Sequence, residues 1–434
     1  MAEQGYHDYK CKNCGGPLIF KGDVNKMVCE FCDSQFDMSE FKDDERVREE
    51  TSDWSQSAGA TMAAGEAGMN EYACNTCGAV MVAEENVGAT ECPYCGNPLV
   101  IKDTFEGMNL PDGLIPFAVD KKSAQDALKN YYSGKKLLPK GFIDNNRMDN
   151  INGVYVPFWL FDCDVEGSVF YKATKERKYN KGQEEWKEIK DFAVSRAANM
   201  KFEKVPADGA KEMNDAYMDS LEPYDYSKIT AYNAAYMSGY VASKYDEDAN
   251  AVKGRVDDRI RTTAKSEIRK TVEGYDSVSE QASDIDIKNG KISYCMIPVW
   301  MLTTRYNGEA YTFAMNGQTG KVTGDLPVDK GQATGYFAKV AGIAFVVFQA
   351  IFFLLKLFQN NNVVGIEIGA LVVALIIGAI ALSSAKSSMV SHQKHEAAQY
   401  LKQGSFKLNR KEDRHTGTRN ELVRKAPEQN AGAK

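Results

Sequence analysis

The chain has 434 residues, 43% hydrophobic and 26% charged, which is the composition of a globular protein long enough for two to four domains. Its formal net charge of −7 is uneven: residues 385–434 carry eleven Lys/Arg and five Asp/Glu (+6), so the remainder carries −13. An acidic body argues against nucleic acid as a partner, because affinity for nucleic acid depends mainly on phosphate neutralisation by Lys and Arg.

Four CxxC pairs lie near the N-terminus, and the first two recur as the last two at an offset of 63 residues. Each pair can form a short turn whose sulfurs face one point, and two turns joined by a β-hairpin supply the tetrahedron of thiolates that Zn2+ prefers. The sequence therefore predicts two small β zinc ribbons, residues 8–35 and 71–100, each with one structural Zn2+. The predicted ligands are Cys11, Cys14, Cys29 and Cys32 in the first ribbon and Cys74, Cys77, Cys92 and Cys95 in the second.

Other interpretations of these cysteines fit less well. A disulfide framework needs an oxidising compartment, and the N-terminal stretch MAEQGYHDYKCKNCGG contains no apolar signal core. A redox CxxC normally stands alone before a helix rather than in two pairs at ribbon spacing. Rubredoxin-like iron stays open as an alternative to zinc, because four thiolates suit both metals. The two remaining cysteines, Cys163 and Cys295, are predicted to be buried, unreactive thiols.

Residues 36–70 are acidic and then rich in Ala, Gly and Ser, which predicts a flexible linker. Residues 101–330 have globular composition and contain a second internal repeat, in which VPFW at 156–159 returns as IPVW at 297–300. We expect each copy to be a β-hairpin that turns at a glycine, Gly167 in the first and Gly308 in the second. Trp159 and Trp300 are then expected in the core.

Three helices are predicted within this region, which makes it an α+β domain, and one of them is a short helix from Ala210 to Leu221. Apolar residues recur every three or four positions from 246 to 275, as on one buried face of a long helix. Asp120 followed by KKSAQDALKNYY is typical of an N-cap and a short helix.

Catalytic patterns are scarce. The four histidines are His7, His392, His395 and His415, so the globular region offers none for a Ser-His or Cys-His pair. GQTGK at 317–321 lacks the spacing of a phosphate-binding P-loop. Glu222 and Asp225 are interpreted as surface turn residues. The sequence therefore favours a protein that is not an enzyme.

Residues 336–384 predict a transmembrane helical hairpin, two apolar stretches separated by QNNN at 359–362, each long enough to cross a hydrocarbon core of about 30 Å. Lysines flank the pair on both outer sides, and the loop between them is uncharged. By the positive-inside rule both termini are cytoplasmic, which predicts a multi-pass protein of the cell membrane. Residues 385–434 are then a basic cytoplasmic tail, whose Lys and Arg can contact anionic lipid.

The sequence has zinc ribbons, a PxW repeat and a membrane hairpin in this order. In this it resembles a bacterial family, the TFIIB-type zinc-ribbon membrane proteins of the YdjG-like type. The resemblance covers nearly the whole chain and is carried by YVPFW (155–159), LEPYDY (221–226), AAYMSGYVASKYD (234–246), IPVW (297–300), NGQTGKVTGDLP (316–327) and GSFKLNRKEDR (404–414). It implies association with phage-shock, PspA-like membrane-stress proteins and recruitment of partners to the bilayer. Two complete ribbons depart from a single-ribbon pattern and leave open which ribbon binds a partner.

The leading hypothesis is a non-enzymatic membrane-anchored adaptor that recruits or positions cytosolic proteins at the inner leaflet. The alternative is a membrane-tethered nucleic-acid-binding protein, which would need a basic ribbon surface; residues 71–102 contain Lys102 as their one cation beside four glutamates. A channel or transporter component is a third hypothesis, for which two spans suffice only in an oligomer.

Overall fold

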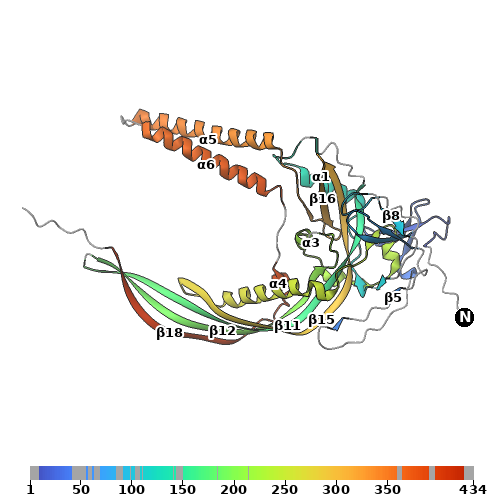
Figure 1. The fold of residues 1–434 in the computed structure, drawn as a ribbon, viewed down its shortest axis with the longest axis horizontal. Coiled ribbons are helices and arrows are strands. Elements are labelled where there is room, and N and C mark those ends of the chain that lie inside the picture. Colours follow the sequence, from blue (N-terminus) through green and yellow to red (C-terminus); the bar gives the residue numbers. More distant parts are fainter. Residues whose placement is uncertain are drawn as a thin grey trace, which may run out of the picture.

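The computed structural model shows one long curved sheet with the cysteine ribbons at one end, and a helical hairpin that runs away from the ribbons on the same side as the far part of the sheet (Figure 1). The structure describes residues 9–41, 55–56, 61–62, 69–84, 91–97, 99–102, 108–109, 111–139, 141–142, 150–182, 184–213, 215–358, 364–390 and 396–424. Most of the predicted linker, residues 36–70, lies outside this part of the chain.

Two long strands form the centre of the sheet. β11 (Asn152–Lys181) pairs antiparallel with β15 (Ser277–Tyr306), and Val156 lies directly opposite Ile297. These two residues are the first positions of the repeated VPFW and IPVW motifs. The two copies of the repeat therefore pair with each other, related by a local two-fold axis.

The tryptophan of each copy is buried, as predicted, and its indole N–H donates a hydrogen bond to a backbone carbonyl in the other half of the domain. Trp159 Nε1 donates to the carbonyl oxygen of Glu247 at 2.9 Å, and Trp300 Nε1 donates to that of Val119 at 2.9 Å. Each carbonyl lies just before a helix, so each tryptophan fixes the start of one helix.

All three predicted helices are present, the one predicted from Ala210 to Leu221 as α3 (Asp215–Leu221), and the other two begin at an aspartate. Asp120 caps α1 (Lys121–Tyr132) and Asp248 caps α4 (Ala249–Lys270), each side chain accepting from the backbone N–H three residues later at 2.7 and 2.8 Å. The predicted apolar stripe of α4 is buried against the sheet: Ala249, Val252, Val256, Ile260, Ala264 and Ile268.

The predicted turn at Gly167 is wrong. β11 runs through this residue without interruption and pairs with β12 (Glu184–Asp208) on both sides of it, with Gly167 opposite Ala198. The missing side chain makes room for α4, because a Cβ at Gly167 would lie 2.8 Å from Cδ1 of Ile268. In the second copy Gly308 does occupy the turn, at φ +86°, between β15 and β16 (Glu309–Asn316).

Strands β11, β12 and β15 extend as an arm, and a fourth strand completes it (Figure 1). β18 (Lys407–Arg424) pairs antiparallel with β12 along nearly its whole length. This strand comes from the segment that the sequence indicates as a basic tail. Almost all of its side chains are exposed, so its sequence lacks the apolar alternation that would predict a strand.

Shorter elements complete the sheet, which is mixed because β10 and β14 run parallel to their long neighbours. The strands that complete it are β4 (Ser55–Gln56), β10 (Gly113–Leu114), β13 (Thr230–Ala231), β14 (Val241–Ser243) and β17 (Val322–Gly324). β5 (Thr61–Met62) and β9 (Met108–Asn109) form a separate two-stranded sheet. The shorter helices are η1 (Met38–Glu40), α3 (Asp215–Leu221), η3 (Tyr226–Lys228), η4 (Ala234–Met237) and η5 (Ala397–Tyr400).

The apolar hairpin consists of α5 (Lys330–Phe358) and α6 (Val364–Ser387). Small residues lie where the helices meet, and a Cβ at Gly378 would come within 2.9 Å of the Cβ of Ala341. Large apolar side chains point outward instead, among them Val346 and Ile380, at 65% and 64% exposure. Both helices are long and apolar enough to cross a membrane.

Candidate metal centres

All four CxxC pairs fold into the same turn. In each, the residue after the second cysteine has positive φ, and its N–H donates to the carbonyl of the first cysteine at 2.8–2.9 Å. Three of these residues are glycines, and the fourth is Asp33, a residue type that tolerates this conformation. The four residues are Gly15 (+75°), Asp33 (+56°), Gly78 (+86°) and Gly96 (+67°).

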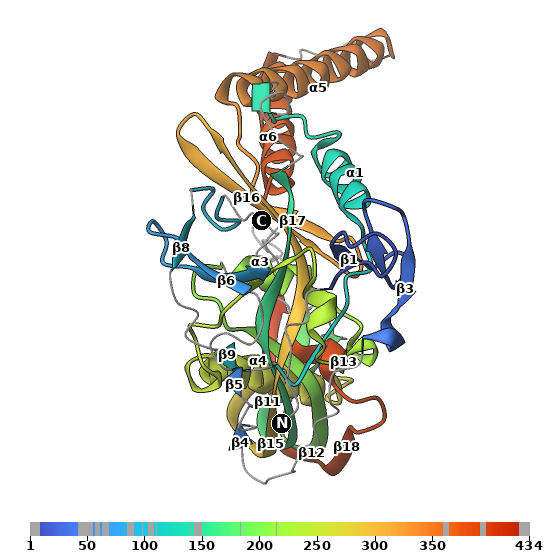
Figure 2. The ribbon, with the colours of Figure 1, turned by 90° about the vertical axis from the view of Figure 1, so that its right-hand side faces the viewer.

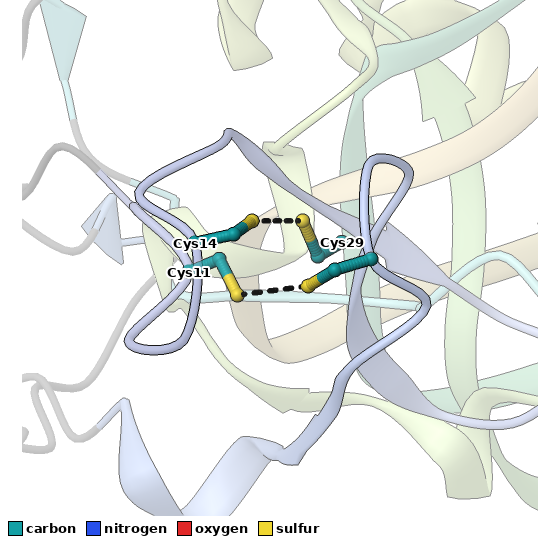
Figure 3. Close-up of side chains that lie close together, drawn as sticks. Cys11, Cys14 and Cys29 are labelled. Carbon is teal, nitrogen blue, oxygen red and sulfur yellow. Dashed lines mark hydrogen bonds between the residues drawn. The ribbon is translucent and has the colours of Figure 1, made fainter.

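The turns of ribbon 1 bring its four predicted ligands together (Figure 3). Sγ of Cys11 lies 3.5 Å from Sγ of Cys32, and Sγ of Cys14 lies 3.4 Å from Sγ of Cys29. The strands that carry the turns are β1 (Leu18–Lys21), β2 (Lys26–Cys29) and β3 (Gln35–Asp37).

Ribbon 2 repeats this arrangement on β6 (Met69–Ala73), β7 (Val80–Glu84) and β8 (Val100–Lys102). Its sulfur pairs, Cys74–Cys95 and Cys77–Cys92, are 3.5 and 3.7 Å apart. In both quartets all sulfurs lie within 4.8 Å of one another. A tetrahedron of thiolates about 2.3 Å from a central ion has edges of about 3.8 Å, so each quartet could hold one metal ion.

The thiols of each quartet cannot all ionise together, because their negative charges would repel. The Ser34 hydroxyl and the Ser34 backbone lower the pKa of Cys32 to about 6. Burial raises the pKa of Cys77 to about 12 and raises that of Cys92 further. Protons would therefore stay on part of each quartet at neutral pH, and a divalent cation would displace them.

Ribbon 1 packs against the segment that carries AAYMSGY. The backbone N–H of Phe20 donates to the carbonyl of Ser238 at 3.1 Å, and the Ser238 hydroxyl donates to the carbonyl of Leu18 at 2.5 Å. The rings of Phe20 and Tyr236 meet edge to face, with centroids 4.8 Å apart. Ribbon 1 is thus fixed to the domain through a strand edge and an aromatic contact.

Ribbon 2 is attached to the continuation of the same segment. β7 pairs with β14, with Val82 opposite Ala242, so the second ribbon extends the sheet of the domain. The ammonium of Lys244 lies 3.1 Å from the carboxylate of Glu71, which is almost fully buried. The two ribbons lie on opposite sides of the central strands (Figure 2).

A buried polar cluster was missed by the sequence analysis. Glu222, assigned there to the surface, is 1% exposed, and its carboxylate accepts from Nη1 and Nη2 of Arg259 at 3.2 and 2.8 Å. Gln399, which follows the helical hairpin, donates to the same carboxylate at 3.0 Å, and Lys321 donates to the Glu222 carbonyl at 2.6 Å. Asp225 is exposed, as predicted for a turn residue, and its carboxylate accepts from the backbone N–H of Ser227 at 3.0 Å.

The neighbouring side chain of Asn316 joins two of the motifs quoted above. It is fully buried, and its amide donates to the carbonyls of Leu221 and Pro223 at 3.0 and 3.3 Å. Its carbonyl oxygen accepts from the N–H groups of Gln318 and Thr319 at 2.9 Å each. LEPYDY and NGQTGK therefore form one structural unit.

Two cysteine quartets that could each hold a metal ion, a mixed sheet and an apolar helical hairpin define this chain as a ribbon protein with candidate membrane spans. No family model and no solved structure matches it. The uncharacterized protein YdjG of Bacillus subtilis (strain 168) is 33% identical over 343 residues, which cover 79% of this chain and 96% of YdjG. The chain belongs to the YdjG family.

Proposed function

We propose that this protein is a non-enzymatic membrane-anchored adaptor that recruits cytosolic proteins to the inner leaflet. The observation that carries the proposal is the closed geometry of both quartets, in which four sulfurs converge and leave no position for substrate. A metal with four cysteine ligands stabilises a fold, whereas catalytic zinc keeps one position open. Zn2+ suits such a site best, and its role in each ribbon is structural.

The anchor of the proposed adaptor is the apolar hairpin, with both of its ends on the cytoplasmic side. The contacts on either side of the hairpin support both ends lying on one side of the bilayer, and the flanking lysines favour the cytoplasmic side. η5 and β18 follow α6, yet they pack on the domain that precedes α5, with Gln399 bonded to Glu222 and β18 paired with β12. Two segments of one folded domain must lie on one side of a bilayer.

Partner identity rests on the family resemblance. TFIIB-type ribbon proteins of this kind accompany PspA-like membrane-stress proteins, and we propose a partner of that class. Both ribbons are fixed on a rigid sheet, so a bound partner would be held at a defined distance from the hairpin.

Affinity purification from detergent-solubilised membranes tests the proposal. The wild type is compared with Cys11→Ser/Cys14→Ser and with Cys74→Ser/Cys77→Ser. Recovery of the same partner with the wild type, and its loss in at least one double variant that is still membrane-bound, is the expected result. A wild-type protein that recovers no partner under any extraction condition would contradict the adaptor function.

Contact with anionic lipid is a further part of the proposal. The cations that follow the hairpin and are exposed on β18 include Lys407, Arg410, Lys411 and Arg414. Each can contribute about 1 kcal/mol near an anionic surface. Flotation of a peptide of residues 404–425 with phosphatidylglycerol vesicles, and no flotation with phosphatidylcholine, is the expected result.

A further inference from the structure

The two ribbons differ in what covers their second turn. The 63-residue repeat aligns Phe31 of ribbon 1 with Tyr94 of ribbon 2, each between the two cysteines of a CxxC pair. Tyr94 is 7% exposed, because the turn packs on the sheet, whereas Phe31 is 76% exposed. Phe31 is the most exposed of the large apolar side chains in the described part of the chain.

Ribbon 2 shows what kind of surface binds such a turn. The hydroxyl of Thr303 on β15 donates to the carbonyl of Pro93 at 2.6 Å and lies 3.3 Å from that of Tyr94. Two residues later, Nη2 of Arg305 donates to Oδ1 of Asn97 at 2.7 Å. Residues two apart on a strand face the same way, so one strand supplies both the hydroxyl and the cation.

The matching turn of ribbon 1 is exposed at all but Ser34, which is half-buried and whose hydroxyl accepts from Nδ2 of Asn13 at 2.9 Å. Glu30 and Ser34 stand where ribbon 2 has Pro93 and Asn97, and Asp33 stands in place of Gly96. Glu30 and Asp33 are both exposed, and they add two carboxylates that ribbon 2 does not have. The turn thus combines the exposed ring of Phe31, which can insert into a partner, with the carboxylates of Glu30 and Asp33, which complement a cation on that partner.

We infer that the second turn of ribbon 1, residues 30–34, is the docking surface for the partner protein. The occupant presents a β-strand with a hydroxyl side chain followed two residues later by Arg or Lys, as β15 does for ribbon 2. A second copy of this chain fits poorly, because its own Thr303 and Arg305 are already engaged by its own ribbon 2. The inference rests on the proposed adaptor function and assigns it to one ribbon.

Photo-crosslinking in intact membranes tests the inference. p-Benzoylphenylalanine replaces Phe31 in the full-length chain, cells are irradiated, and the attached peptide is sequenced. The expected product joins residue 31 to one other protein, within a strand that carries a hydroxyl and a cation two residues apart. The same probe at Phe170, which is 46% exposed on the arm, is the matched control and should not give this product.

Charge variants give a second measurement. Glu30→Lys and Asp33→Asn, each combined with the probe, should lower the crosslink yield about tenfold, the loss expected for one interfacial charge contact. Asn suits the positive φ of residue 33, so that variant keeps the turn. Zinc content, measured on each variant, reports whether the ribbon is still folded.

The outcomes separate the two proposals. Attachment at residue 31 to lipid, to another copy of this chain, or to nothing, while a partner still co-purifies with the wild type, would overturn the docking site and leave the adaptor function standing. Absence of any co-purifying partner would instead count against the adaptor function.

Discussion

Glu222 and Arg259 form a two-pronged ion pair in which the carboxylate is 1% and the guanidinium 11% exposed. Gln399 completes it from beyond the helical hairpin. The pair therefore joins the long helix α4, the LEPYDY motif and the segment that follows the hairpin. Displacement of the segment around Gln399 from the domain would break its hydrogen bond to the pair.

Replacing Glu222 should destabilise the domain strongly. Glu222→Ala leaves the guanidinium of Arg259 buried without its two-pronged partner, beside the carboxylate of Asp219 at 3.5 Å, and we expect a loss of about 3–5 kcal/mol in unfolding free energy. Thermal unfolding in detergent measures it. Glu203→Gln is the matched control, since its pair with Lys402 is exposed and should contribute less than about 1 kcal/mol. Equal losses in the two variants would contradict the importance of the buried pair.

Asp208 should make stability depend on pH. Burial raises its pKa to about 7, because Arg255 divides its charge between Asp208 and Asp215 and offsets the burial only in part. The folded state then binds this proton more tightly than the unfolded state, whose Asp has a pKa of about 4. The resulting stabilisation is full below pH about 4 and is lost as pH rises to about 7.

The variant Asp208→Asn removes this titration. Melting temperatures of wild type and variant, taken with zinc present from pH 5.5 to 7.5, should diverge so that the wild type loses stability relative to the variant as pH rises. A constant difference across this range would show that Asp208 keeps an ordinary pKa.

Metal content should be two ions per chain. Cys11→Ser and Cys74→Ser should each lower it by one, as measured by elemental analysis of purified protein. Loss of the second ribbon should make the domain more sensitive to protease than it is in the wild type, because β7 pairs with β14 and Tyr94 is buried against the sheet. One ion or none in the wild type would contradict the prediction, and iron in place of zinc would assign the quartets to the alternative metal.

Gly22→Ala should release ribbon 1 from the domain. A Cβ at this position would lie 1.6 Å from the carbonyl oxygen of Phe117, and backbone cannot give way as a side chain can. Hydrogen exchange of residues 9–41 should increase in the variant. Gly254→Ala in α4 is the control: its Cβ meets nothing within 4 Å, and alanine should stabilise the helix by about 0.5–1 kcal/mol.

We predict that the domain shared by both ends of the hairpin is cytoplasmic, because lysines flank the hairpin and its loop is uncharged. An epitope inserted within residues 359–362 should be accessible to antibody on intact spheroplasts, whereas one attached after residue 434 should need permeabilised cells. Protein that alkaline carbonate extracts from the membrane would contradict the anchoring itself.

The ribbons and helices could be predicted from sequence because their signals are local. Cysteine spacing determines which sulfurs can meet, and the capping aspartates Asp120 and Asp248 mark helix starts whose apolar period continues for several turns. All of these elements are present in the structure, and the ends of the helices differ from the predicted ends by a few residues.

The errors concern residues whose environment is set by distant parts of the chain. Gly167 has the turn preference of any glycine, but Ile268 of α4 packs where its side chain would be. Glu222 is surrounded in sequence by polar and aromatic residues, and its burial depends on Arg259 and Gln399. Strand β18 has no alternating apolar pattern, so only its pairing with β12 identifies it.

The hydrogen bonds that Trp159 and Trp300 make across the domain have a consequence for biosynthesis. Trp159 holds the start of a helix that is translated later, and Trp300 holds the start of one that is translated earlier. Neither half can complete its core until residue 300 has left the ribosome, although each ribbon needs only its own four cysteines to close. The nascent chain is thus expected to acquire metal first, close its sheet second, and add β18 after the hairpin has been made.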